Sequence, residues 1–378
     1  MTDHPVLNPD SVLDPGSGGG YDVAIAGGGI AGASLAAALA PHARVVVLES
    51  ESTPGLHATG RSAAFWSETY GGPAIQPLTT ASGAALREGG FLESLGSLHI
   101  GRASDSAAAA VFLDEFRDSP VALESVDPHA HVPGLRDDWT IGIWEPSCAY
   151  IDVAGLHAHY LAQARRAGAV IATDAGVRSA ARRDERWSIE TPAGRFTAPV
   201  LVNAAGAWAD VVAARCGVRP IGIRPYRRTM VQLRTDPAPP AGLPHVADIA
   251  GGFYFKPESG GRLWLSPHDE IPTDPCDAAP EEIDVAIAID RLQGAVDWRI
   301  KAVEHRWAGL RSFAPDRRPV YGFAEPGFFW CAGQGGFGIQ TAPAAAALAA
   351  ALILDRSPDL PGVDPARYAP GRFVDSIR

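Results

Sequence analysis

Residues 21–34 read YDVAIAGGGIAGAS, an apolar run followed by three consecutive glycines and by a fourth three residues later. Glycine loses more conformational freedom on folding than any other residue, so such a cluster indicates that something must approach the backbone closely. The run 22–26 is typical of a buried strand, residues 31–40 of a helix that ends at Pro41, and residues 43–50 of a second buried strand. Together these segments predict the right-handed crossover unit of a dinucleotide-binding fold.

In such a unit each glycine has a separate task. Gly27 allows the turn, Gly29 omits the side chain that would block a pyrophosphate, and Gly32 lets the helix pack on the strand. Glu49, at the end of the second strand, is placed to accept hydrogen bonds from a ribose. The alternative is a crossover with a purely structural role. Because the strand, the helix, the second strand and the terminal acid all agree with cofactor binding, this alternative is the weaker interpretation.

Composition describes a soluble globular protein of about two domains, with 378 residues, 46% hydrophobic and 20% charged. The formal net charge of −11 argues against binding to nucleic acid. The four cysteines lack the paired spacings of metal or redox sites, so we expect reduced thiols, no metal and a cytoplasmic location. Residues 1–20 are predicted to be a disordered leader and not a signal peptide, and no apolar run is long enough to span a membrane.

The rest of the chain alternates between two kinds of pattern. A helix at 153–166, a strand at 169–173, a hairpin at 178–198 and an apolar strand from Pro199 suggest that the first sheet resumes. Further helices are expected near 79–87 and 107–116.

Residues 224–234 and 252–267 instead read as antiparallel strands, the second pair closed by a Ser-Gly-Gly turn, which predicts a second domain of β type. The segment 307–313, a strand at 327–332 and an Ala-rich helix with Pro343 in its first turn lead back to the first domain.

Four blocks carry a resemblance to a known family. They are DVAIAGGGIAGAS (22–34) with VVVLES (45–50), GRSAA (60–64), VLVNAAGAWAD (200–210), and WAGLRSFAPD (307–316) with FFWCAGQGGFGIQT (328–341). In this order they resemble the flavin-dependent D-amino-acid oxidase family, which includes glycine and sarcosine oxidases, and most closely its D-arginine dehydrogenase branch. The match extends from about Tyr21 to Leu354.

The resemblance implies an α/β + β fold. A Rossmann-like, discontinuous FAD-binding domain would comprise residues 21–80, 145–215 and 305–378, and a substrate-binding domain with a largely antiparallel β-sheet would comprise 81–144 and 216–304. FAD is expected to be held without a covalent bond. Besides the four residues named above, the implied FAD contacts are Ile30, Ala31, Ser50, Thr59, Arg61, Ser62, Ala63, Val177, Ala205, Gly206, Trp208, Arg311, Gly333, Gln334, Gly335, Gly336, Phe337, Gly338, Ile339 and Gln340. A helix beginning near Ile339 would direct its positive end at the flavin.

The resemblance also implies the catalytic residues. Arg228 and Arg311 match two arginines that clamp the substrate carboxylate, a task suited to planar guanidinium groups. Arg227 stands beside Arg228, and a slip of one residue would turn the other arginine toward the site. Tyr254 in the β-sheet roof and Tyr70 in a mobile lid match substrate contacts, and Gln340 would lie close to the flavin.

Three departures from the branch bear on the substrate. Phe65 replaces a histidine that follows GRSAA, and the acid that grips the guanidinium of D-arginine has no clear counterpart, unless Asp105 serves after a shift in alignment. Because burying an unpaired cation is costly, D-arginine should be a poor substrate. His245 stands where the branch has an apolar residue, and we interpret it as either a pocket residue or a solvated loop histidine, the latter being favoured.

The resemblance therefore predicts oxidation of the Cα–N bond of a neutral or apolar D-amino acid by hydride transfer to flavin N5, followed by hydrolysis of the imine to a 2-oxo acid and ammonia. The alternatives are a glycine or sarcosine type of oxidation, oxidation of a 2-hydroxy acid, or a flavin-binding module without catalysis. The electron acceptor is left open, whether oxygen, a quinone or another compound.

Overall fold

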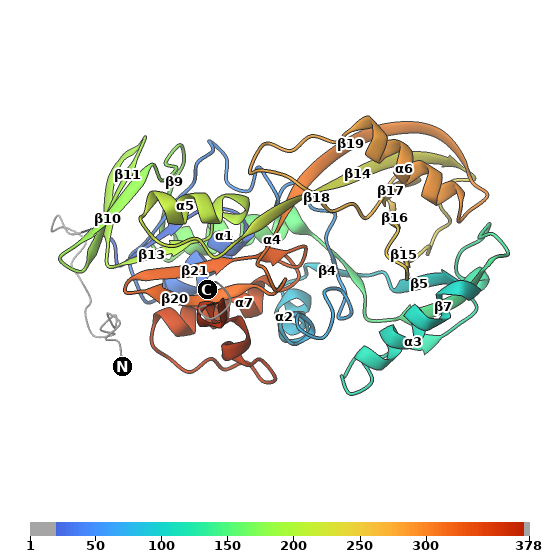
Figure 1. Cartoon of the computed structure of the whole chain (residues 1–378), viewed down its shortest axis with the longest axis horizontal. Helices are drawn as coiled ribbons and strands as arrows, with labels where there is room; N and C mark the ends of the chain where they lie inside the picture. Colours follow the sequence, from blue (N-terminus) through green and yellow to red (C-terminus); the bar gives the residue numbers. More distant parts are fainter. Residues whose placement is uncertain (1–19, 374–378) are drawn as a thin grey trace.

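The computed structural model describes residues 20–373, which form two lobes side by side (Figure 1). Residues 1–19 of the predicted leader lie outside the described part. The first lobe is built on a six-stranded sheet in the order β20 (Val320–Glu325), β21 (Phe328–Ala332), β13 (Val200–Asn203), β1 (Val23–Ala26), β2 (Val45–Leu48) and β9 (Val170–Ala172). All neighbours pair in parallel except β20 with β21. Every residue of β1, β2, β13 and β21 is buried, as expected for strands covered on both faces.

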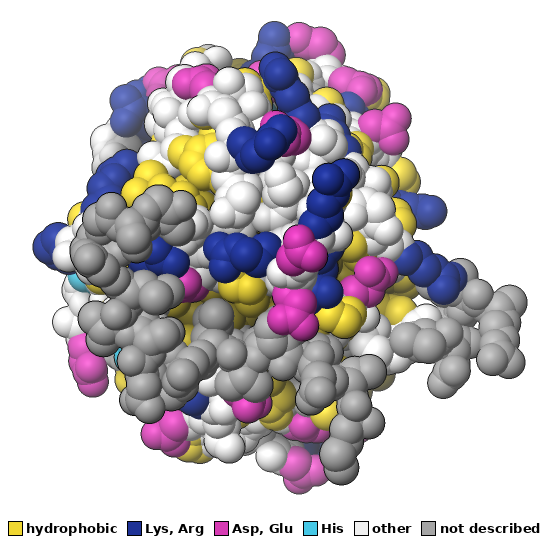
Figure 2. Space-filling view, turned by 90° about the vertical axis from the view of Figure 1, so that its left-hand side faces the viewer, with side chains coloured by type: hydrophobic (Ala, Val, Ile, Leu, Met, Phe, Trp, Pro, Cys, Tyr) yellow, Lys and Arg dark blue, Asp and Glu magenta, His cyan; other side chains and the backbone are white. Residues whose placement is uncertain are grey.

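Helices cover one face of this sheet and a small sheet with a short helix covers the other. On the first face, α1 (Ile30–Leu39) packs against α4 (Val153–Arg166) and α7 (Ala342–Ile353), and α2 (Gln76–Glu88) packs against α7. On the second face lie α5 (Ala209–Arg215) and the antiparallel strands β10 (Ser179–Arg183), β11 (Arg186–Thr191) and β12 (Gly194–Ala198). On the side of the molecule shown in Figure 2, basic side chains are interspersed with acidic ones.

The second lobe contains a ten-stranded sheet. Its path is β22 (Gln334–Gly335), β19 (Arg299–Phe313), β14 (Arg224–Asp236), β17 (Arg262–Ser266), β16 (Tyr254–Glu258), β15 (His245–Asp248), β5 (Ser97–Arg102), β7 (Trp139–Glu145) and β6 (Glu124–Ser125), with β18 (Ile271–Pro272) also paired to β14. Every pair is antiparallel except β15 with β5. The long strands β14 and β19 extend from the first lobe across the second (Figure 1).

Smaller elements complete the second lobe and the junction. Helix α6 (Glu282–Gln293) packs on the ten-stranded sheet, and α3 (Ser106–Glu115) lies beside β5 and β7. A separate three-stranded sheet has the order β3 (Phe65–Trp66), β8 (Ala149–Ile151) and β4 (Leu92–Ser94). Short 3-10 helices occupy Ala103–Asp105, Pro128–Ala130, Gly206–Trp208, Pro365–Tyr368 and Pro370–Phe373.

The fold class predicted from the sequence is confirmed: a Rossmann-like α/β sheet accompanies a largely antiparallel one. The helix expected at 153–166 has those bounds, and the two expected near 79–87 and 107–116 are Gln76–Glu88 and Ser106–Glu115. The helix expected to begin near Ile339 begins at Ala342, so that prediction is wrong by three residues, although Pro343 does lie in its first turn. The four cysteines are free thiols.

Candidate active site

A cavity of about 420 Å³ has walls from both large sheets. Its dinucleotide end begins at the turn between β1 and α1, where Gly27 has a φ of 104° that favours glycine. Gly32 does not line the cavity; a Cβ on this residue would overlap the carbonyl oxygen of Gly27, so its task is the close packing of helix on strand.

Glu49 organises the backbone at this end. Its Oε2 accepts a hydrogen bond from the Gly28 N–H at 2.7 Å, and its Oε1 accepts from the Glu51 N–H at 2.9 Å and from Ser50 Oγ at 3.1 Å. Glu49 is 6% exposed yet lines the cavity, so the remaining lone pairs of its carboxylate can accept bonds from a ribose.

The first turn of α1 provides the cradle for a phosphate. Gly29 and Ile30 line the cavity, and the Ile30 N–H donates to Thr59 Oγ1 at 3.0 Å. A Cβ on Gly29 would stand only 3.2 Å from Thr59 Oγ1, in the space between the helix terminus and residue 59. A backbone without a side chain at the N-terminus of a helix suits a pyrophosphate, and these residues therefore fit the dinucleotide half of FAD.

Sequence reasoning missed several residues at this end. His57 lines the cavity, donates from Nε2 to Glu51 Oε1 at 3.0 Å and lies 4.7 Å from the Trp208 ring, while its buried Nδ1 has no hydrogen-bond partner. Arg215 also lines the cavity and donates to the Val177 carbonyl at 2.8 Å. Both residues lie outside the four blocks, so nothing in the local sequence distinguished them.

Arg61 binds residues 277 and 278, in a segment that borders the cavity. Its Nη1 donates to the carbonyl of Ala278 at 2.7 Å and its Nη2 pairs with Asp277. Ala278 and the exposed Cys276 line the cavity beside it. The residue thus joins the GRSAA block to the segment that precedes α6.

The two arginines expected to bind a carboxylate meet at the other end of the cavity. Arg228, 5% exposed, donates from Nε to the Asp269 carbonyl at 2.7 Å, but its buried Nη1 and Nη2 have no hydrogen-bond partner. Burial, and then the charge of Arg317, lower the pKa of Arg311 to about 9. Glu270 lies 3.6 Å from Arg228 and 3.7 Å from Arg311, and it also pairs with Arg317 at 2.8 Å; the Asp269 carboxylate lies 3.6 Å from Arg228 Nε.

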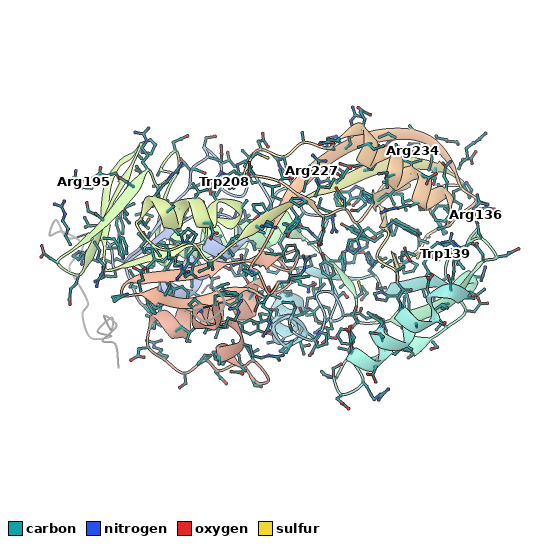
Figure 3. The ribbon with its side chains drawn as sticks, viewed as in Figure 1. Arg136, Trp139, Arg195, Trp208, Arg227 and Arg234 are labelled. Atoms are coloured by element: carbon teal, nitrogen blue, oxygen red, sulfur yellow. The ribbon has the colours of Figure 1, made fainter. Side chains whose placement is uncertain are left out.

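The strand register separates Arg228 from its neighbour. On β14, Arg228 faces the cavity, whereas Arg227 pairs with Glu281 and, at 2.8 Å, with the buried Asp284 of α6. Figure 3 shows Arg227 on β14 at the junction of the lobes. The cavity arginine is therefore the one that the resemblance implied.

Aromatic side chains line the cavity around the arginines. The Phe65 ring lies 5.1 Å from the Tyr70 ring and 6.2 Å from the Tyr254 ring. Tyr254 donates from its hydroxyl to Met230 Sδ at 3.2 Å. A Cβ on Gly336 would overlap both Arg311 Nη2 and the Tyr70 hydroxyl, so these two groups converge beside the bare Gly336 backbone.

Gln340 lines the cavity, but its amide is engaged within the protein. Its Nε2 donates to the Tyr70 carbonyl at 3.0 Å and to Thr79 Oγ1 at 2.9 Å, and its Oε1 accepts from the Ser67 N–H at 3.3 Å. These bonds hold the segment that carries Tyr70.

One expectation about an outlying residue is wrong, and the conditional role of Asp105 finds no support. His245 is not a solvated loop residue: it lies on β15, is 2% exposed, shares a 2.9 Å hydrogen bond with Ser97 and packs behind Phe65 at 4.0 Å, outside the cavity wall. Burial holds the pKa of His245 well below its usual value, so the imidazole is neutral. Asp105 accepts from the Arg102 N–H at 2.7 Å and does not line the cavity.

Most of the implied site residues do gather in this one cavity. The exceptions are Gly32, Gly333 and Phe337, of which Phe337 packs 5.1 Å from Tyr70. The residues that line the wall are Gly27, Gly29, Ile30, Ala31, Glu49, Ser50, Thr59, Arg61, Ser62, Ala63, Tyr70, Val177, Ala205, Gly206, Trp208, Arg228, Tyr254, Arg311, Gln334, Gly335, Gly336, Gly338, Ile339 and Gln340. Among the described residues, no group of three metal-binding side chains and no helix suited to crossing a membrane is found.

Curated relatives match this chain to different extents. Human mitochondrial dimethylglycine dehydrogenase is 35% identical over 127 residues, which are 32% of this chain and only 14% of that protein. Glycine oxidase of Geobacillus kaustophilus is 25% identical over 364 residues, 88% of this chain and 93% of that protein.

Solved structures share the fold over nearly the whole chain. L-proline dehydrogenase from P. horikoshii has a TM-score of 0.83 at 22% identity, covering 94% of this chain and 98% of that one. Glycine oxidase from Geobacillus kaustophilus has a TM-score of 0.80 at 25% identity, with 92% and 98% covered. The family model described as FAD dependent oxidoreductase (DAO) matches residues 22–352. The chain therefore belongs to the DAO family of FAD-dependent oxidoreductases, and FAD is its cofactor.

Proposed function

We propose that this protein oxidises the Cα–N bond of a small amino acid, with a preference for neutral or apolar D-amino acids. One observation carries the proposal: the buried Arg228, whose two terminal nitrogens have no hydrogen-bond partner, and the largely buried Arg311 share a cavity with a dinucleotide cradle. A buried guanidinium nitrogen without a hydrogen-bond acceptor is costly, and the two oxygens of a carboxylate can accept from both terminal nitrogens.

The side chains around the arginines would hold the substrate and exclude water. Arg228 and Arg311 bind the carboxylate, while Phe65, Tyr70 and Tyr254 cover the carbon that reacts. The amine must be unprotonated so that its lone pair can form the C=N bond as two hydrogens leave the C–N unit. FAD, when bound, would accept one of these hydrogens with both electrons as a hydride, and the other leaves the nitrogen as a proton. Water then adds to the imine and releases a 2-oxo acid and ammonia.

The preference for an uncharged side chain follows from the acids of the cavity wall. Its only acidic residues in the described chain are Glu49 and Glu51, both at the dinucleotide end. A cationic substrate side chain would find no carboxylate in the wall beside Tyr70 and Tyr254, so its desolvation would not be compensated.

The stereochemical part of the proposal rests on the resemblance to the D-arginine dehydrogenase branch. Relatives are named glycine oxidase and L-proline dehydrogenase. Glycine, sarcosine, L-amino acids and 2-hydroxy acids therefore belong in the same test, as does a protein that binds flavin without catalysis. Non-covalent FAD and a cytoplasmic location remain predictions.

An anaerobic bleaching screen tests the proposal. Under nitrogen, FAD-loaded protein is mixed with both enantiomers of neutral and charged amino acids, and absorbance of the flavin band is followed. We expect bleaching by neutral D-amino acids, with ammonia and the 2-oxo acid as products. Bleaching by glycolate or lactate alone would contradict the amine assignment, and bleaching by L-enantiomers alone would contradict the stereochemical one. Repeating the reaction in air with peroxide detection distinguishes an oxidase from a dehydrogenase.

Two adjacent arginines supply a matched pair of variants. Arg228→Met should keep FAD and raise KM by about a hundredfold, since a charge-assisted carboxylate contact contributes about 3 kcal/mol. Arg227→Met should instead lower the free energy of unfolding, because the buried Asp284 loses its partner, with little change in KM. Equal effects of the two variants on KM would remove Arg228 from the substrate site.

A further inference from the structure

Glu145 lies outside the cavity wall and accepts hydrogen bonds from residues 67, 68 and 69, which directly precede Tyr70. Glu145 ends β7 and has no exposed surface. Its Oε2 accepts hydrogen bonds from Thr69 Oγ1 at 2.7 Å and from Ser67 Oγ at 2.8 Å, and its Oε1 accepts from the Glu68 N–H at 2.7 Å. Donors on three successive residues therefore converge on a single carboxylate.

The carboxylate of Glu145 is charged despite its burial. Burial by itself would raise the pKa of Glu145, but His99, 3.8 Å away, and the bonds from Thr69 and Ser67 together lower it below the usual value. Hydrogen bonds to an ionised acceptor are stronger than neutral ones, so this contact fixes the segment firmly.

Residues 67–70 lead to the end of the cavity where Arg311 lies. Gln340 holds the Tyr70 carbonyl from the opposite side at 3.0 Å. The Tyr70 ring lies 5.6 Å from the Arg311 guanidinium, and the two groups converge beside Gly336. Tyr70, expected to belong to a mobile lid, is thus held through its own carbonyl by Gln340 and through the preceding residue, Thr69, by Glu145.

We propose that Glu145 is a positioning residue that sets where Tyr70 stands against Arg311, and thereby sets the affinity of the cavity for a carboxylate. The proposal rests on the proposed function in one respect, namely that Arg311 binds a carboxylate. Glu145 itself lies outside the cavity wall, so it acts only through residues 67–70.

Two hydroxyl residues separate this role from a purely structural one. Thr69→Val removes a bond between Glu145 and the Tyr70 segment without changing the shape of the side chain. Ser147→Ala removes a 3.3 Å bond to the same carboxylate from a residue that is not part of the segment. Both variants remove a hydrogen bond to Glu145, but only Thr69→Val removes one that connects Glu145 to the segment preceding Tyr70.

The experiment titrates sodium acetate into FAD-loaded protein and follows the flavin absorption band, while FAD affinity is measured separately on apoprotein. We expect Thr69→Val to raise the acetate Kd at least about threefold, as for the partial loss of a charge-assisted hydrogen bond, with unchanged FAD affinity. Ser147→Ala should match the parent. Glu145→Gln, which keeps an acceptor for the Glu68 N–H, should fall between the parent and Glu145→Ala, and KM should rise more than kcat falls.

The outcomes distinguish this inference from the proposed function. Equal acetate affinity in Thr69→Val and the parent would overturn the role of Glu145 and leave the proposed function intact. A parent protein that takes up FAD but shows no response to acetate would overturn both. Loss of FAD affinity in Thr69→Val would show that the segment supports the cofactor, which also contradicts the role proposed for Glu145.

Discussion

Lys256 is a buried cation that the proposed reaction does not use. It follows Tyr254 by two residues on β16, is 4% exposed, and places Nζ 4.4 Å from the centre of the Tyr150 ring and 4.7 Å from that of Trp264. Burial lowers the pKa of Lys256 to about 8. Because the unfolded chain keeps a proton on this amine up to about pH 10, it binds more protons than the folded protein between these values, and stability rises with pH there.

Replacing Lys256 tests this predicted increase in stability with pH. In the parent protein, this residue should raise the free energy of unfolding by about 2 kcal/mol between pH 7.5 and 10. Lys256→Met should remove that rise, as measured by urea denaturation at the two pH values. The other lysine of the chain, Lys301, is half exposed and pairs with Asp236, so Lys301→Met is the control and should retain the rise. An equal pH dependence in Lys256→Met and in the parent would contradict the assignment.

At the scale of residues, sequence reasoning identified most of the residues that line the cavity, but it could not predict the direction of individual side chains. Arg311 lies in a block whose resemblance to the family implied its role, and it lines the cavity. Arg228 could not be distinguished from Arg227 because facing depends on strand register and on the distant Asp284 of α6. The misplaced His245 has the same cause, since its burial depends on Phe65 and Ser97 from remote segments.

At the scale of elements, the close contact between β1 and α1 leaves no room for a side chain at position 32. Gly32 lies where a Cβ would overlap the Gly27 carbonyl oxygen. Gly32→Ala should therefore separate helix from strand, lower the unfolding temperature of the apoprotein and weaken FAD binding by at least about tenfold. Scanning calorimetry and apoprotein titration measure the two effects. Gly371→Ala is the control, because nothing lies within 4 Å of its added Cβ. Unchanged FAD affinity in Gly32→Ala would contradict this account.

Local sequence patterns predicted elements well where the pattern lies within one element. Helix α4 has the predicted bounds because its apolar period and flanking glycine are local signals. Helix α7 begins later than expected because Pro343 has no N–H to donate to the Ile339 carbonyl, which accepts instead from the Ala342 N–H at 3.2 Å. The parallel pairing of β15 with β5 joins segments far apart in sequence, and no local pattern could reveal it.

The whole molecule is organised around a cavity with walls from both large sheets, so the cofactor should stabilise the two together. FAD at about a hundred times its Kd should add about 2.7 kcal/mol to the free energy of unfolding. ADP, which can occupy only the dinucleotide end, should raise the thermal midpoint less than FAD at equal saturation. Calorimetry of the apoprotein with each compound measures this difference. Equal shifts would mean that the flavin end contributes no contacts.

At this scale the sequence predicted both types of sheet and the family. It did not predict the hydrogen bonds that hold the residues of the candidate site in place. The anchoring of Tyr70 by Glu145 and Gln340 joins three regions that are separate in sequence. The division of the chain into two discontinuous domains stays a prediction, although strands from the expected FAD-binding segments do form the six-stranded sheet.

The segment fastened by Arg61 also carries an intrinsic chemical handle. Cys276 is the one exposed thiol of the four cysteines and borders the cavity. A maleimide dye can therefore be attached at this position without any substitution. Its rate of attachment, and the emission of the attached dye, would report in real time whether the cavity is filled.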